Sequence, residues 1–185
     1  MHHDRKSLRH VTPSFRIWIS NFIRNWHDYM RAAEALCLLV LFGFAQRFIP
    51  IAWWSGFLGC NARIPKHWQG VKTVTAMQRL SVIEERAVAI AIRRAYRRLP
   101  FQPTCLAQAS AGQMMLRRRG RSGVVVIGMR LYPISTDKRW EAHAWLLGKC
   151  GAITGGKNAH GFTPTNVFEV PGGLSADKIL LNDND

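Results

Sequence analysis

The segment from Thr104 to Arg119 constrains the fold more than any other part of the sequence, because its apolar residues lie on nearly every side of a helix. They are Leu106, Ala107, Ala109, Ala111, Met114, Met115 and Leu116. A helix that is hydrophobic all round is buried within its domain. Gly120 follows as a C-terminal cap. The sequence therefore predicts a central helix that begins at Thr104 or Cys105.

Strands are predicted after this helix. Residues 123–132 form a valine- and isoleucine-rich run typical of a buried strand. Residues 142–147 and 152–154, separated by a turn at 148–151, predict a hairpin, and residues 162–170 predict a short strand. Residues 133–139 are expected to form a loop. These elements predict an α+β fold in which a central helix packs on a small antiparallel sheet.

The part of the chain before the central helix predicts further helices. Residues 14–26 combine aromatic side chains at helical spacing with arginines, and residues 28–49 are more apolar still. The uncharged run 35–45 is much shorter than the roughly twenty residues of a membrane span, which favours a core helix or a helix on a membrane surface. Ser81 and Glu84 predict a capping box at the start of a helix, and Pro100 predicts the end of that helix. Residues 59–61 predict a turn.

Three regions are expected along the chain. Residues 1–75 form an N-terminal helical region with a loose start of about 13 residues. Residues 76–170 form the main domain, which contains the central helix and the predicted strands, and residues 171–185 form a C-terminal tail.

The net charge of +15 predicts an anionic partner, which could be nucleic acid, an anionic lipid surface or an acidic peptide. Nucleic acid is disfavoured because no helix-turn-helix, RRM or zinc pattern is present. Many arginines stand near helix C-termini, where they complement the helix dipole and face water or form a surface for an acidic partner or lipid: Arg93, Arg94, Arg97, Arg98, Arg117, Arg118, Arg119 and Arg121.

The four cysteines form neither a CxxC pair nor a cluster with metal-ligand spacing. We therefore expect no metal and no cofactor. The absence of a recognisable signal peptide favours free thiols in a cytoplasmic setting, with peripheral membrane contact as an added option.

Cys105 and His143 are the candidate catalytic residues. Cys105 stands in the first turn of the central helix, where unpaired amides and the helix dipole favour a thiolate. His143 stands in a short strand and could take the thiol proton and later protonate the leaving amine. The alternatives are a buried structural cysteine and a core histidine. The order of a cysteine-bearing helix, a strand and a histidine-bearing strand is the one a papain-like core requires, and it favours catalysis.

The remaining site residues are less clearly indicated. The Cys105 backbone amide and Gln102 are candidate oxyanion donors. Folding the hairpin about residues 149–150 places Gly155 opposite His143, with Asn158 just beyond. Either the Asn158 side chain or a backbone carbonyl could orient the imidazole.

Four short segments together resemble the transglutaminase-like leader peptidases of lasso-peptide biosynthesis: LPFQPTCL at 99–106, LRRRG at 116–120, VIG at 126–128 and AHAW at 142–145. The resemblance extends over about residues 31–170. It implies a transglutaminase/papain-like fold in which Cys105 and His143 act with an acidic third residue to cleave a leader from a ribosomal precursor peptide. Gly155 stands near the position of that acidic residue.

The same resemblance implies the partners. The apolar first eighty residues resemble the split form of the family, which works with a separate leader-recognition protein and an ATP-dependent lasso cyclase. Two rival functions remain. The first is acyl transfer to an amine by the same thioester, as in transglutaminases, and the second is a non-catalytic basic scaffold at a membrane surface.

Overall fold

The computed structural model describes residues 13–64, 79–134, 137–149 and 151–175, and the structural statements below refer to these residues. In chain order the elements are α1 (Pro13–Phe48), α2 (Ile51–Trp54), the 3₁₀ turn η1 (Ser55–Phe57), β1 (Cys60–Ala62), α3 (Arg79–Tyr96), α4 (Cys105–Arg117), β2 (Val124–Ile134), β3 (Asp137–Gly148), β4 (Gly151–Thr154), the 3₁₀ turn η2 (Gly156–Asn158) and β5 (Thr163–Glu169).

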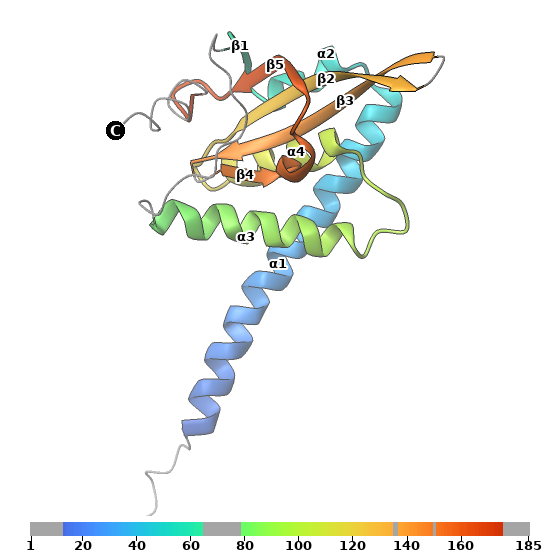
Figure 1. Ribbon diagram of the computed structural model, residues 1–185. Coiled ribbons are helices and arrows are strands. Elements are labelled where there is room, and N and C mark those ends of the chain that lie inside the picture. The colour runs from blue at the N-terminus through green and yellow to red at the C-terminus, as the bar shows by residue number, and fades with distance from the viewer. Residues whose placement is uncertain (1–12, 65–78, 135–136, 150, 176–185) are drawn as a thin grey trace, which may run out of the picture.

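The strands form one five-stranded sheet in the order β1-β5-β2-β3-β4, with every neighbouring pair antiparallel. Helix α4 packs against β2, β3 and β4, and α1 and α3 pack against α4 on the same side (Figure 1). The α+β prediction of helices on a small antiparallel sheet is confirmed.

Helix α4 is the central helix that the sequence predicts. Eight of its residues are buried, from Ala107 to Leu116. The helix begins at Cys105, where the Thr104 hydroxyl accepts a hydrogen bond from the Ala107 N–H at 3.1 Å. It ends in a Schellman motif, because Arg121 N–H donates to Leu116 O and Gly120, at φ +65°, donates to Arg117 O.

Helix α1 is one continuous helix, where the sequence indicated two segments. Its first turns extend away from the rest of the molecule, and its second half contributes Ala35, Leu39 and Phe42 to the core that surrounds α4 (Figure 1). Side chains from both sides of the expected boundary at residue 75 thus share one core. No helix in the described ranges is long and apolar enough to cross a membrane.

Three local predictions were wrong. Residues 60–62 form an edge strand, where a turn was expected, because they pair with β5. Residues 133–139 were expected to be a loop, but β2 continues to Ile134 and β3 begins at Asp137, so the two strands pair almost to the turn. Helix α3 begins at Arg79, so Ser81 lies inside the helix rather than before it.

Several other expectations lie outside the described residues. They are the loose start over residues 1–12, the connector beyond residue 64, the turn position 150 and the end of the tail from residue 176.

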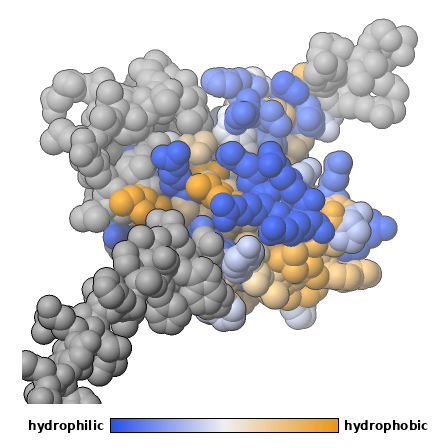
Figure 2. Space-filling model, turned by 90° about the horizontal axis from the view of Figure 1, so that it is seen from below, coloured by the Kyte–Doolittle hydropathy of each residue, from blue (hydrophilic) through white to orange (hydrophobic). Residues whose placement is uncertain are grey.

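Ion pairs hold the three helices together. Arg119, just after α4, lies 2.6 Å from Glu34 of α1 and 3.8 Å from Glu84 of α3, and Arg31 lies 3.7 Å from Glu84. Glu84 is therefore engaged in helix–helix contacts rather than in the predicted capping box. Figure 2, which views the molecule from the side of α3, shows hydrophilic side chains spread across the middle of this face.

A buried glutamine joins the start of β2 to the segment before β1. Gln113 is fully buried in α4, and its side-chain amide donates to Leu58 O at 3.1 Å and to Gly123 O at 3.0 Å. Its carbonyl oxygen accepts from Gly123 N–H at 2.9 Å. All three bonds satisfy buried backbone groups, which fixes α4 against the sheet.

Candidate active site

Cys105 lies at the first position of α4, with its half-buried side chain directed toward β3. The thiol accepts a hydrogen bond from the Ala144 backbone N–H at 3.4 Å. This amide is available because β4 pairs with β3 only from Leu146 to Gly148, so no strand of the described ranges covers this edge of β3 before residue 146. The open edge of β3 thus allows the N-terminus of α4 to bring its cysteine next to the residue that follows His143.

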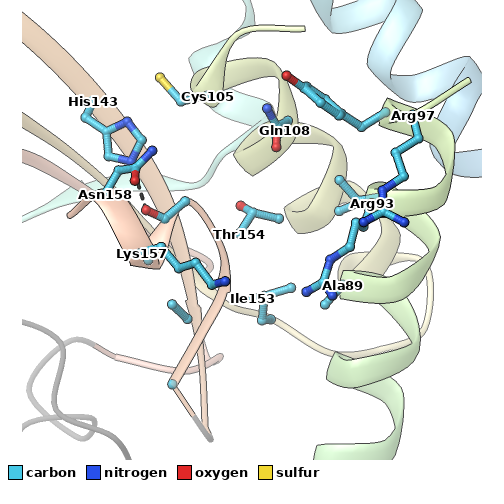
Figure 3. Close-up of a pocket in the computed structure, with 16 residues that line it drawn as sticks. Ala89, Arg93, Arg97, Cys105, Gln108, His143, Ile153, Thr154, Lys157 and Asn158 are labelled. Atoms are coloured by element: carbon cyan, nitrogen blue, oxygen red, sulfur yellow. Dashed lines mark hydrogen bonds between the residues drawn. The ribbon is translucent and has the colours of Figure 1, made fainter. Parts of the chain in front are cut away.

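His143 lies in β3 and is partly buried between two aromatic rings. Its ring centroid is 6.0 Å from that of Trp145 and 5.2 Å from that of Phe162. Figure 3 shows the Cys105 thiol and the His143 ring at the same end of one cleft. The two side chains share no hydrogen bond here, as is common in unliganded enzymes whose catalytic contacts tighten when substrate binds.

The His143 ring is held by a backbone carbonyl. Its Nε2 lies 2.9 Å from the carbonyl oxygen of Gly155, which is the dashed contact in Figure 3. A carbonyl oxygen can only accept, so Nε2 carries the proton and Nδ1 remains the basic nitrogen. This arrangement gives His143 the tautomer that a general base needs.

Gly155 occupies a position that suits only glycine. Its φ is +74°, and a Cβ built there would lie 2.6 Å from the Ala144 carbonyl oxygen and 3.0 Å from the Trp145 Cβ. The left-handed turn after β4 thus brings the Gly155 carbonyl to the imidazole.

Of the two groups expected to orient the His143 imidazole, the Asn158 side chain and a backbone carbonyl, only the carbonyl is hydrogen-bonded to it among the described residues. The Asn158 side chain is exposed and lines the cleft, but it makes no hydrogen bond to His143 among the described residues. The Gly155 carbonyl makes that bond instead. Asn158 is thus near the site without holding the ring, and a catalytic role for it stays a prediction.

The oxyanion donors differ in part from those expected. The Cys105 N–H belongs to the first turn of α4, where amides have no partner within the helix. Gln102 is exposed and does not line the cleft, so the structure does not bring it to the site. Gln108 lines the cleft instead, with its amide donating to Pro103 O at 3.1 Å. Its spacing of three residues from Cys105, on the same helix face, is the sequence signal that could have identified it.

The cleft has a volume of about 930 Å³ and lies between α3 on one side and β4 with η2 on the other. Small residues of β4 and η2 line one wall, and Arg93 and Arg97 line the opposite wall. A cleft of this size accommodates several residues of an extended peptide.

Residues 38–167, more than two thirds of the chain, match the transglutaminase-like superfamily. The chain belongs to this superfamily. The matched range begins within α1 and ends in β5, so it includes Cys105, His143 and Gly155. No curated protein and no solved structure shows a significant match.

Membership of the transglutaminase-like superfamily agrees with the geometry of the site. A cysteine at a helix N-terminus and a histidine on an adjacent strand are the groups for cysteine-dependent hydrolysis or acyl transfer. Both reactions pass through a thioester on the cysteine, and they differ only in whether water or an amine accepts the acyl group.

Proposed function

We propose that this protein is a cysteine peptidase that removes the leader from a ribosomally made precursor peptide, like the leader peptidases of lasso-peptide biosynthesis. The observation that supports peptidase chemistry best is the arrangement around β3. The amide after His143 contacts the Cys105 thiol, while the Gly155 carbonyl holds the far nitrogen of the imidazole. The specific link to lasso-peptide maturation rests on the four sequence segments described above.

The proposed reaction begins when Nδ1 of His143 takes the proton of the Cys105 thiol. The sulfur then attacks the scissile carbonyl carbon, and the negative charge on its oxygen is stabilised by the Cys105 N–H. The imidazolium protonates the leaving amine as the peptide bond breaks, which leaves a thioester. A water molecule, deprotonated by His143, then hydrolyses the thioester and restores the free thiol.

The Cys105→Ala variant tests the proposal. Full-length protein and precursor peptide are incubated with a candidate leader-recognition protein, and products are identified by mass spectrometry. We expect wild type and Cys37→Ala to release the leader, and Cys105→Ala to release none. Cys37 is the matched control because it is an exposed thiol outside the cleft. Unchanged processing by Cys105→Ala would rule out peptidase chemistry at this cysteine.

The same assay separates hydrolysis from acyl transfer. We include a primary amine at high concentration, which competes with water for the thioester. A peptidase produces mainly the free carboxylic acid, whereas an acyl transferase produces mainly the amide, and the two products differ in mass. Amide formation in preference to acid would favour the acyl transferase.

The proposed partners follow from the resemblance to the split family form. A separate leader-recognition protein delivers the precursor to this cleft, and an ATP-dependent cyclase receives the freed core peptide. We expect processing to accelerate when the recognition protein is present. Equal rates with and without it would remove this partner from the scheme.

A second candidate role is attachment to an anionic membrane surface, and exposed apolar side chains support it. The end of α1 and the following turns expose Phe48 (73%), Trp53 (83%) and Phe57 (52%), next to the exposed Arg47. Aromatic and basic side chains together are typical of interfacial helices. Flotation with anionic vesicles tests this role, with Phe48→Ser/Trp53→Ser as the comparison variant. Absence of binding by the wild type would dismiss it.

A further inference from the structure

Three basic side chains line the active-site cleft beyond the catalytic pair. Arg93 and Arg97 come from α3 and the turn after it, and Lys157 comes from η2. Figure 3 shows Cys105 and His143 toward one end of the cleft, with the two arginines and the lysine along it on opposite sides. A chain that extends from the thiol into the cleft would therefore pass between positive charges from both walls.

These three cations have no acidic partner among the described residues, unlike several other arginines of the protein. Arg31 and Arg94 pair with Asp28, and Arg118 and Arg119 pair with Glu34. Among the described residues that line the cleft there is no aspartate or glutamate. Asp28 and Glu34, which pair with these arginines, do not line the cleft. The positive charges of Arg93, Arg97 and Lys157 are therefore not neutralised by a described carboxylate.

The walls of the cleft suit an extended peptide. Ala89, Arg93 and Arg97 follow one another at four-residue spacing, so they form one ridge along α3 and the turn that follows it. On the other side, β4 is an edge strand, and Gly151 and Ala152 line the cleft with little side-chain bulk. A substrate backbone can thus lie along β4 while its side chains reach the arginine ridge.

We propose that this cleft recognises an acidic segment of the precursor on one side of the scissile bond, with carboxylates paired to Arg93, Arg97 and Lys157. This inference rests on the proposed peptidase function and names its substrate class. Arginine forms bidentate bonds with carboxylates, so the ridge gives directional recognition as well as attraction. A single-stranded nucleic acid fits less well. Proteins bind such ligands by stacking bases on several aromatic side chains, and the described lining of the cleft has only the rings of Tyr96 and His143.

The test measures binding separately from catalysis. Full-length Cys105→Ala protein is titrated into two fluorescein-labelled peptides of equal length, one with several glutamates and one with glutamines at the same positions, and anisotropy gives each Kd. We expect the acidic peptide to bind at least about ten-fold more tightly, as charge-assisted hydrogen bonds imply, with the preference shrinking at high salt. Equal affinity for both peptides would overturn the inference.

Two triple variants with the same loss of charge locate the effect. Arg93→Gln/Arg97→Gln/Lys157→Gln removes the cleft cations, while Arg98→Gln/Lys149→Gln/Arg121→Gln removes exposed cations that do not line the cleft. We expect the first variant to lose the preference and the second to retain it. Equal losses in both variants would indicate only general charge attraction and would overturn the inference. The inference would also be overturned if an oligonucleotide bound the protein as tightly as the acidic peptide and bound the first variant more weakly.

Failure of this inference and failure of the peptidase proposal give different results. If the wild type cleaves acidic and neutral forms of a precursor equally well, the peptidase function stands and the acidic recognition is wrong. If no cleavage occurs while the acidic peptide binds through the three cations, the recognition stands without the peptidase.

Discussion

The imidazole Nε2 of His143 lies 2.9 Å from the carbonyl oxygen of Gly155. A peptide group therefore occupies the position that a side-chain carboxylate or amide holds in catalytic triads. The carbonyl accepts the same hydrogen bond and fixes the same tautomer, but it brings no full negative charge to stabilise the imidazolium.

Replacing Gly155 with alanine should disturb catalysis more than folding. The added Cβ would lie 2.6 Å from the Ala144 carbonyl oxygen, so the turn must shift and take its own carbonyl away from His143. We expect kcat/KM to fall on the order of a hundred-fold, the cost of a misplaced catalytic group. Leader release is measured by mass spectrometry, and folding by circular dichroism.

Gly172→Ala is the control for this change. Gly172 has a similar φ of +71°, but a Cβ there meets nothing within 4 Å. It should lose about 1 kcal/mol of stability to left-handed strain and keep its activity. An equal loss of activity in both variants would contradict a specific role for the Gly155 carbonyl.

Asn158→Ala should lower the rate without abolishing it. The Asn158 side chain lines the cleft but makes no hydrogen bond to the imidazole among the described residues, so its loss leaves the His143–Gly155 contact in place. We expect a smaller decrease in kcat/KM than for Gly155→Ala in the same assay. Kinetics identical to wild type would remove Asn158 from the site, and a complete loss would mean that it holds the ring in the substrate complex.

Cys105 should be the most reactive described thiol although it is not the most exposed. Cys37 and Cys60 are exposed, whereas Cys105 is only partly accessible. The Cys105 thiol accepts a hydrogen bond from the Ala144 N–H and shares its cleft with His143, the proposed proton acceptor. Iodoacetamide at neutral pH, followed by peptide mapping, should therefore modify Cys105 first. His143→Ala should remove this priority. Labelling that simply follows exposure would show that Cys105 is not activated.

Gln113→Leu should strongly destabilise the protein. The substitution leaves the Leu58 and Gly123 carbonyls and the Gly123 N–H buried without partners. Each unpaired buried group costs about 1–3 kcal/mol, so we expect the free energy of unfolding to fall by roughly 3 kcal/mol or more in urea titrations. Gln108→Leu, which removes one hydrogen bond at the cleft, should cost far less. Similar losses for both variants would contradict this account of Gln113.

The sequence was informative where burial dictates residue type. The all-round apolar segment after Thr104 predicted α4, and the valine-rich run predicted β2, because a buried helix or strand shows its environment in its composition. The order of these elements brought Cys105 and His143 into one cleft, as expected.

The sequence was less informative where strand pairing or backbone geometry determines the local structure. The three-residue strand β1 exists because β5 pairs with it, and so short a segment has no pattern of its own. Gly155 has no functional side chain, so its hydrogen bond to His143 has no residue signature beyond glycine itself. Gln102 precedes the helix and is exposed outside the cleft, whereas Gln108 lies on the helix face that borders the cleft.

The position of Cys105 at the start of α4, which packs against two helices and three strands, links activity to global unfolding. Because α4 contacts α1, α3 and three strands, its first turn has no independent way to melt. Loss of activity on heating should therefore coincide with loss of the whole fold, with no inactive yet folded state at lower temperature. Hydrogen exchange of the α4 amides after the first turn should show the same cooperativity, proceeding only when the entire domain opens.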